Sequence, residues 1–170
     1  MTSLQIFGLA LGGIALLTAG TYALPRHVSV ERVATLSASP DQILALAASN
    51  QGYQRFNPYK DMDPKLKIDL FGPESGVGSG FAFHGKDGQG RQTVADVGTD
   101  RVVYAIDLGP MGTPTQSITA QAVAGGSKVT WRMDSDLGFN PIFRVFGLFM
   151  DRMVGRSFEI GLEKLGRATA

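Results

Sequence analysis

The chain opens with an apolar stretch that carries no charged side chain before Arg26. From Leu4 to Leu24 almost every residue is apolar or small, and about 20 such residues suffice to cross a bilayer as a helix. Pro25 then ends the helix. The pattern predicts one transmembrane anchor over residues 1–24, which holds the rest of the chain at a membrane. A cleaved secretory signal is the alternative, although its apolar core usually spans about 7–15 residues behind a basic start, and no basic side chain precedes this run.

Alternating apolar and polar positions predict strands through most of the remaining chain. Residues 27–36 carry β-branched side chains in near alternation, and Ser39-Pro40 then marks the start of a helix that continues to about Ser49. A short aromatic helical turn is predicted over residues 52–59. Six more strands follow, over residues 66–71, 76–85, 91–97, 101–108, 117–123 and 128–134. The connections are too short for crossovers, so we expect an antiparallel meander.

The period changes after Asn140-Pro141, where a long helix is predicted over residues 142–165. At about 100° per residue, one broad face of this helix is apolar. That face contains Phe143, Phe146, Phe149, Met150, Met153, Val154 and Phe158. A curved sheet with an apolar concave face must bury it, and only this helix is long enough. The fold class is therefore α+β: about seven antiparallel strands around a long C-terminal helix, in one domain over residues 25–170.

The composition of the chain excludes several kinds of partner and functional site. The net charge is +1 and there is no cysteine, which argues against nucleic acid as a partner and excludes disulfides and thiolate metal sites. His84 alternates with Phe81 and Phe83 and is predicted to point outward, and His27 adjoins the predicted anchor. No acidic cluster accompanies either histidine. We therefore predict no catalytic residue, no metal site and no cofactor.

Several local motifs resemble those of the polyketide cyclase/dehydrase branch of the START-like (SRPBCC) superfamily. They are Ala38-Ser39-Pro40-Asp41-Gln42-Ile43, Phe56-Asn57-Pro58-Tyr59, Gly76-Val77-Gly78-Ser79, Val129-Thr130-Trp131-Arg132-Met133, and Gly147-Leu148-Phe149-Met150-Asp151 running into Phe158-Glu159 and Gly161-Leu162. The resemblance covers residues 25–165 and implies the helix-grip fold. Phe56 and Tyr59 depart from the family's usual tryptophans, which puts the shape of the pocket mouth in question.

The resemblance also implies a hollow between sheet and helix that holds a hydrophobic molecule. The residues expected around it are Phe56, Tyr59, Phe71, Phe81, Phe83, Ile106, Trp131, Met133, Phe146, Met150 and Met153. The alternative is that the same aromatic and methionine side chains form a solid core.

Three functions are compatible with this reading. The first is a membrane-anchored, non-catalytic module that binds a lipid or other small hydrophobic ligand. The second is an enzyme of the cyclase or dehydratase type, which would need a buried titratable group that the sequence does not reveal. The third is an accessory subunit of a larger membrane complex, favoured by a filled interior and an exposed apolar patch near Val145 and Leu148. The sequence leaves the side of the membrane open.

Overall fold

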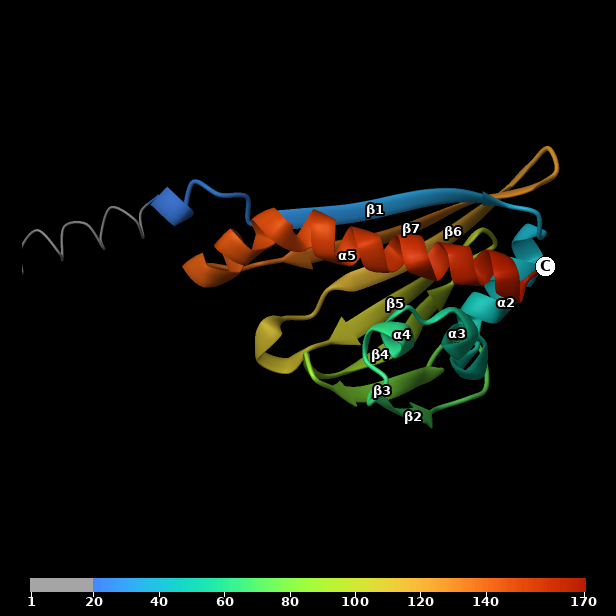
Figure 1. Ribbon diagram of the computed structural model, residues 1–170, viewed down its shortest axis with the longest axis horizontal. Helices are drawn as coiled ribbons and strands as arrows, with labels where there is room; N and C mark the ends of the chain where they lie inside the picture. Colours follow the sequence, from blue (N-terminus) through green and yellow to red (C-terminus); the bar gives the residue numbers. More distant parts are fainter. Residues whose placement is uncertain (1–19) are drawn as a thin grey trace, which may run out of the picture.

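The computed structural model describes residues 20–170. Seven strands, four labelled α-helices and one short 3₁₀ helix follow one another along this part of the chain (Figure 1). In chain order they are β1 (His27–Leu36), α2 (Pro40–Ala48), α3 (Asn50–Phe56), α4 (Tyr59–Met62), β2 (Lys67–Phe71), β3 (Gly80–Gly85), β4 (Gly88–Val97), β5 (Arg101–Asp107), η1 (Gly109–Met111), β6 (Thr115–Val123), β7 (Gly126–Asp136) and α5 (Pro141–Ala168). The α+β class and the long C-terminal helix are confirmed.

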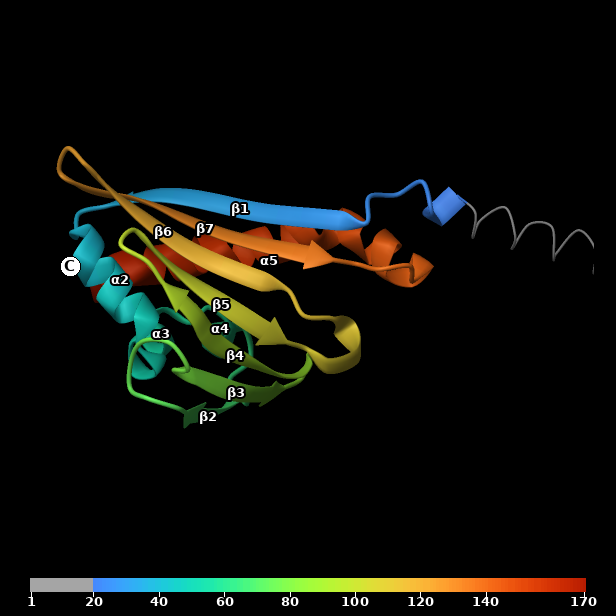
Figure 2. The same cartoon turned by 180° about the vertical axis from the view of Figure 1, so that it is seen from behind.

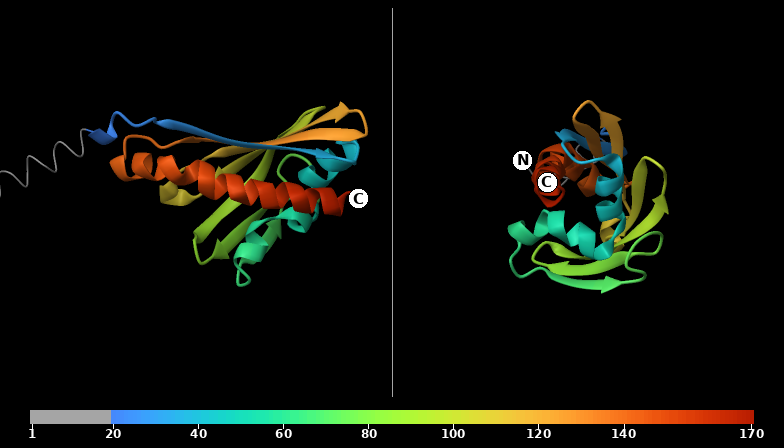
Figure 3. Two further views of the ribbon diagram at one scale, coloured as in Figure 1. Left: turned by 45° about the horizontal axis from the view of Figure 1, so that its top comes forward. Right: turned by 90° about the vertical axis from the view of Figure 1, so that its right-hand side faces the viewer.

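All seven strands form one antiparallel sheet in the order β1-β7-β6-β5-β4-β3-β2. The first strand thus pairs with the last, with Val30 opposite Met133. A register shift between Val94 and Asp96 interrupts the β4–β5 pairing, and such bulges bend a strand. Seen end-on, the sheet curves around the helices (Figure 3). Its outer, convex face is not covered by any helix of residues 20–170 (Figure 2).

Two short helices close one end of the concave side. Ser39 caps α2 in a capping box with Gln42, and Pro40 occupies the first turn, where its missing N–H costs nothing. Ser49 then caps α3 through the backbone N–H of Gly52. Helix α2 packs on β5 and β6, and α3 packs against α5.

Helix α5 covers the open side of the curved sheet, where it packs on β1 and α3 (Figure 3). Asn140 caps its first turn by accepting a hydrogen bond from the Ile142 N–H. In its second half, the Phe158 ring stacks on the Trp131 indole with centroids 4.8 Å apart. This contact joins the helix to β7 at the centre of the core.

Two local predictions differ from the structure. Residues 76–79 were expected to begin a strand, but Gly76 and Gly78 have positive φ values of 88°, so the chain turns there and β3 begins at Gly80. The helical segment expected over residues 52–59 is divided into α3 and α4, because Pro58 follows Asn57 and cannot continue the α3 hydrogen bonds.

The predicted anchor over residues 1–24 lies almost entirely outside the described residues. Within residues 20–170, no helix combines the length and apolar character needed to span a bilayer.

Candidate functional site

The concave side of the sheet is filled by a cluster of aromatic rings. Tyr53 and Phe56 project from α3 and meet Trp131 of β7, with the Phe56 and Trp131 centroids 5.7 Å apart. Tyr104 of β5 and Phe81 of β3 contact Tyr53 from the other side, at 5.5 and 5.2 Å. All five side chains are buried. The end of the concave side nearest α3 is therefore solid.

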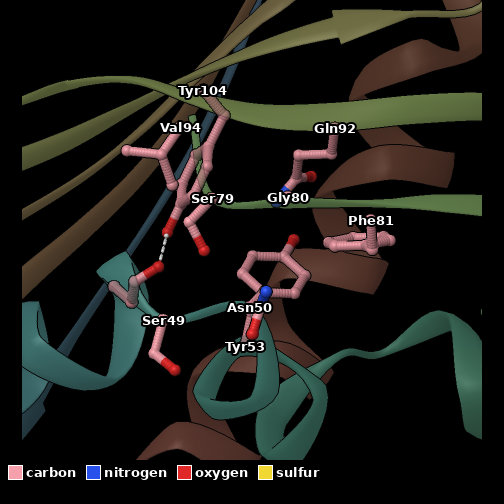
Figure 4. Close-up of a pocket in the computed structure, with 10 residues that line it drawn as sticks. Ser49, Asn50, Tyr53, Ser79, Gly80, Phe81, Gln92, Val94 and Tyr104 are labelled. Carbon is pink, nitrogen blue, oxygen red and sulfur yellow. Dashed lines mark hydrogen bonds between the residues drawn. The ribbon is translucent and has the colours of Figure 1, made fainter. Parts of the chain in front are cut away.

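A small cavity of about 10 Å³ remains beside this cluster, close to the room that one water molecule needs. Its lining is partly polar (Figure 4). The residues are Ala47, Ser49, Asn50, Tyr53, Ser79, Gly80, Phe81, Gln92, Val94 and Tyr104. The Tyr104 hydroxyl donates to the Ala47 carbonyl oxygen at 2.8 Å. Such a space is too small for a lipid unless side chains move.

The titratable groups of this interior are tyrosines. Desolvation raises the pKa of Tyr53 and of Tyr104 above the ordinary value, although a hydrogen bond to Gln92 opposes part of the shift at Tyr53. Both hydroxyls are therefore protonated near neutral pH and act as hydrogen-bond donors. Neither can serve as a base there.

Two buried glutamines add polar groups to the inner face of the sheet. Gln92 of β4 lies beside Tyr53, and Gln116 of β6 accepts a hydrogen bond from the Trp131 indole N–H at 3.1 Å. Sequence reasoning missed these residues because a polar side chain on the inward phase of a strand breaks the apolar alternation. Gln92 could have been found from its position in the strand, because it is two residues from the inward-facing Val94 and therefore lies on the same face of the sheet.

The seam between α4 and α5 is a contact at the edge of this interior, where partly exposed side chains adjoin buried ones. Ser157 of α5 lies at its centre and contacts the Met62 sulfur at 3.6 Å, the Met153 carbonyl oxygen at 3.3 Å and the Tyr59 hydroxyl. Desolvation raises the pKa of Tyr59, although 38% of the residue is exposed, because its hydroxyl is turned inward. Met62 and Met153 are more than a third exposed. The seam therefore places flexible apolar side chains at the rim of the core.

The structure brings together part of the predicted pocket lining. Six of the predicted residues are buried inside: Phe56, Phe81, Ile106, Trp131, Met133 and Met150. Phe83 is partly buried and packs beside Phe81 with ring centroids 6.3 Å apart. Tyr59 and Met153 flank the seam, while Phe146 lies half exposed on the first half of α5.

Phe71 lies apart from the others. It pairs with Gly80 in the β2–β3 register, which places it on the face opposite to Phe81, where the Arg91 guanidinium covers its ring at 4.4 Å. The register explains this placement, because Leu70, the neighbour of Phe71, is the residue directly opposite Phe81.

The broad apolar face expected for α5 is divided in the structure. Phe143, Met150, Val154 and Phe158 pack on the core, whereas Phe146, Phe149 and Met153 are exposed. The expected face spans about 180° of the helix at 100° per residue, and β1 with α3 covers only part of that arc. An exposed apolar surface is left on the first half of the helix.

These features define a helix-grip protein: a curved antiparallel sheet closed by one long C-terminal helix, with an interior of apolar and hydrogen-bonding side chains. Residues 27–169 match the family described as polyketide cyclase/dehydrase and lipid transport, and the chain belongs to that family.

Solved structures share the fold at low sequence identity. Protein CV1439 from Chromobacterium violaceum is 12% identical with a TM-score of 0.61, over 84% of this chain and 97% of that one. The KanY protein is 16% identical with a TM-score of 0.63, over 84% and 97%. The di-domain ARO/CYC protein BexL, from the BE-7585A biosynthetic pathway, is 13% identical with a TM-score of 0.63, over 85% of this chain and 50% of its own length. No curated protein is similar enough in sequence to count as a match.

Proposed function

We propose that this protein is a membrane-anchored, non-catalytic module that binds a lipid or another small hydrophobic molecule between its sheet and α5. The observation that carries the proposal is the seam between α4 and α5. There Tyr59, Met62 and Met153 are partly exposed to solvent, while Ser157, which contacts Met62, and its neighbour Phe158 are buried.

The seam suits the entry of an apolar molecule. Methionine side chains are unbranched and rotate at little cost, so Met62 and Met153 can open a path without moving the backbone. Ser157 and the hydroxyl of Tyr59 provide a buried polar pair behind Met62, which suits a ligand with one polar end. The family and the ARO/CYC neighbour support a hydrophobic ligand for this fold.

The interior chemistry supports binding over catalysis. Among residues 20–170, the titratable groups in the small cavity are tyrosines whose raised pKa keeps them protonated. A dehydratase or cyclase requires a positioned general acid or base with a pKa near the working pH. The described interior favours a site that orients a ligand by hydrogen bonds.

The proposal is tested by native mass spectrometry of the full-length protein extracted with minimal detergent. We expect an additional non-covalent mass, and we expect Met153→Trp to lower its occupancy several-fold because an indole at this exposed position blocks the seam. Val123→Trp is the matched control, since Val123 is also exposed but lies in the β6–β7 hairpin far from α4. An empty wild-type protein, or equal occupancy in both variants, would contradict the proposal.

One observation favours a second function, that of an accessory subunit in a membrane complex. The cavity beside the aromatic cluster holds about 10 Å³, and large apolar side chains including Val145 and Leu148 are exposed on α5. An empty protein that is extracted together with other membrane proteins would support this role instead.

A further inference from the structure

The first three turns of α5, with the residue before their cap, form an exposed apolar surface, which we name the apolar tip. Its large side chains are Phe139, Ile142, Val145, Phe146, Leu148 and Phe149. Phe139 and Ile142 are 68% and 72% exposed. From Phe139 to Met150 the single charged residue is Arg144. Contiguous exposed apolar surfaces mark contact with a protein partner or a membrane.

Arg144 does not make the tip polar, because its side chain is buried. It donates from Nη1 to the carbonyl oxygens of Tyr22 at 2.9 Å and Leu24 at 3.3 Å, and from Nε to that of Gly138 at 3.1 Å. These bonds fasten residues 22–24 to the start of α5. Residues 20–25, the described end of the uncharged run that precedes Arg26, therefore meet the domain at the tip (Figure 1).

A second arginine reinforces this junction. Arg26 forms a two-point ion pair with Asp136 at the end of β7, at 2.7 and 2.6 Å, and its guanidinium lies 4.9 Å from the Phe139 ring centroid. The start of the described chain, the end of β7 and the tip are thus held as one unit.

The border of the tip carries positive charge. Arg152 and Arg156 are exposed on α5, and within residues 20–170 neither has an ion-pair or hydrogen-bond partner. The nearby carboxylate of Asp151 is paired with Arg32 at 2.9 Å, as Asp136 is with Arg26. Anionic headgroups are the natural counter-charge for two unpaired arginines beside an apolar surface.

We propose that the apolar tip inserts into the interfacial region of a lipid bilayer that contains anionic lipids, with Arg152 and Arg156 at the headgroups. This rests on the membrane anchoring in the proposed function and adds a second point of contact. A bilayer suits this surface better than a protein partner does. The uncharged residues before Arg26 reach the domain at the same place, where Arg144 holds the backbone of Tyr22 and Leu24. The two arginines at the border lack a carboxylate partner within residues 20–170, and anionic headgroups would supply one.

The test uses the full-length chain in vesicles of phosphatidylcholine and phosphatidylglycerol. Because the chain has no cysteine, Phe149→Cys and Val123→Cys each accept a single fluorescent label. Both positions are exposed. The β6–β7 hairpin, which carries Val123, lies at the end of the domain away from the start of α5 (Figure 1). Each label is quenched either by lipids with brominated acyl chains or by acrylamide in the water.

We expect the label at position 149 to be quenched by the brominated lipids and to lose several-fold of its accessibility to acrylamide. The label at position 123 should show the reverse. Replacing phosphatidylglycerol by phosphatidylcholine should reduce lipid quenching at 149, because the arginines lose their counter-charge.

Three results would overturn the proposal. If the chain floats with the vesicles but the label at 149 stays open to acrylamide, the tip does not insert, while the anchor stands. Protection from both quenchers would mean that a second copy of the chain covers the tip. A chain that does not float with the vesicles would contradict both the insertion of the tip and the membrane anchor. Ligand binding would still be tested separately, by native mass spectrometry.

Discussion

Gly161 lies at the closest approach between α5 and the indole of Trp131. A methyl group there would overlap the buried ring, which cannot move because Phe158 stacks on its face. We expect Gly161→Ala to destabilise the fold by up to about 2 kcal/mol, since overpacking costs about 1–3 kcal/mol and the gain in helix propensity returns about 1 kcal/mol. Urea denaturation followed by circular dichroism measures the change.

Gly166 is the matched control on the same helix. A methyl group there would meet only the flexible end of Leu36, at 3.1 Å. Gly166→Ala should therefore be neutral or stabilising by up to about 1 kcal/mol. Equal effects at both positions would show that α5 does not lie against Trp131 as described.

At the scale of elements, Arg32 of β1 holds the middle of α5. Its guanidinium donates to Asp151 at 2.9 Å and to Glu159 at 2.8 Å, and it lies directly against Gly155, which has no side chain to displace it. The hydrogen bond and charge of Arg32 lower the pKa of Asp151. The pair therefore stabilises the fold fully above the unfolded carboxyl pKa of about 3.9 and loses its effect as the pH falls below it.

Replacing Asp151 by Asn should lower the denaturation midpoint at neutral pH and make the midpoint less sensitive to acid below pH about 4. Asp69→Asn is the control, because Asp69 is exposed on β2 and has no ion-pair partner within residues 20–170. The measurement is the urea midpoint across the pH range. An acid dependence identical in wild type and Asp151→Asn would contradict a stabilising role for this pair.

The elements also show how far the sequence could predict the structure. The strands and α5 were predictable because alternation and capping residues are local signals, as at Ser39 and Asn140. The face of the sheet on which Phe71 lies was not predictable. Leu70 and Phe71 are adjacent apolar residues, and only the pairing with β3 decides which one faces inward.

The exposed side of α5 could not be predicted from a local sequence pattern either. The helix carries apolar residues over about half its circumference, and the share that is buried depends on how far the sheet extends along it. The interior glutamines escaped prediction for the related reason that their roles depend on partners such as Trp131, which lies on another strand.

At the scale of the whole molecule, the apolar groups have an uneven distribution. The end closed by α2 and α3 is packed with aromatic rings, whereas the opposite end presents the apolar tip beside the start of the described chain (Figure 1). The seam between α4 and α5 lies between these regions, on the same helix as the tip. A module that takes an apolar molecule from a bilayer would need such an order: a membrane contact, a flexible entrance and a hydrogen-bonding interior.

The most direct test of this account is the position at which a photoreactive lipid attaches to the full-length protein. The experiment uses vesicles that contain a diazirine-bearing phosphatidylcholine, ultraviolet activation and peptide mass mapping. We predict cross-links within residues 59–62 and 150–158, reduced several-fold by Met153→Trp and unchanged by Val123→Trp. Cross-links confined to the apolar tip, or equally strong at the seam in both variants, would contradict a ligand site between the sheet and α5.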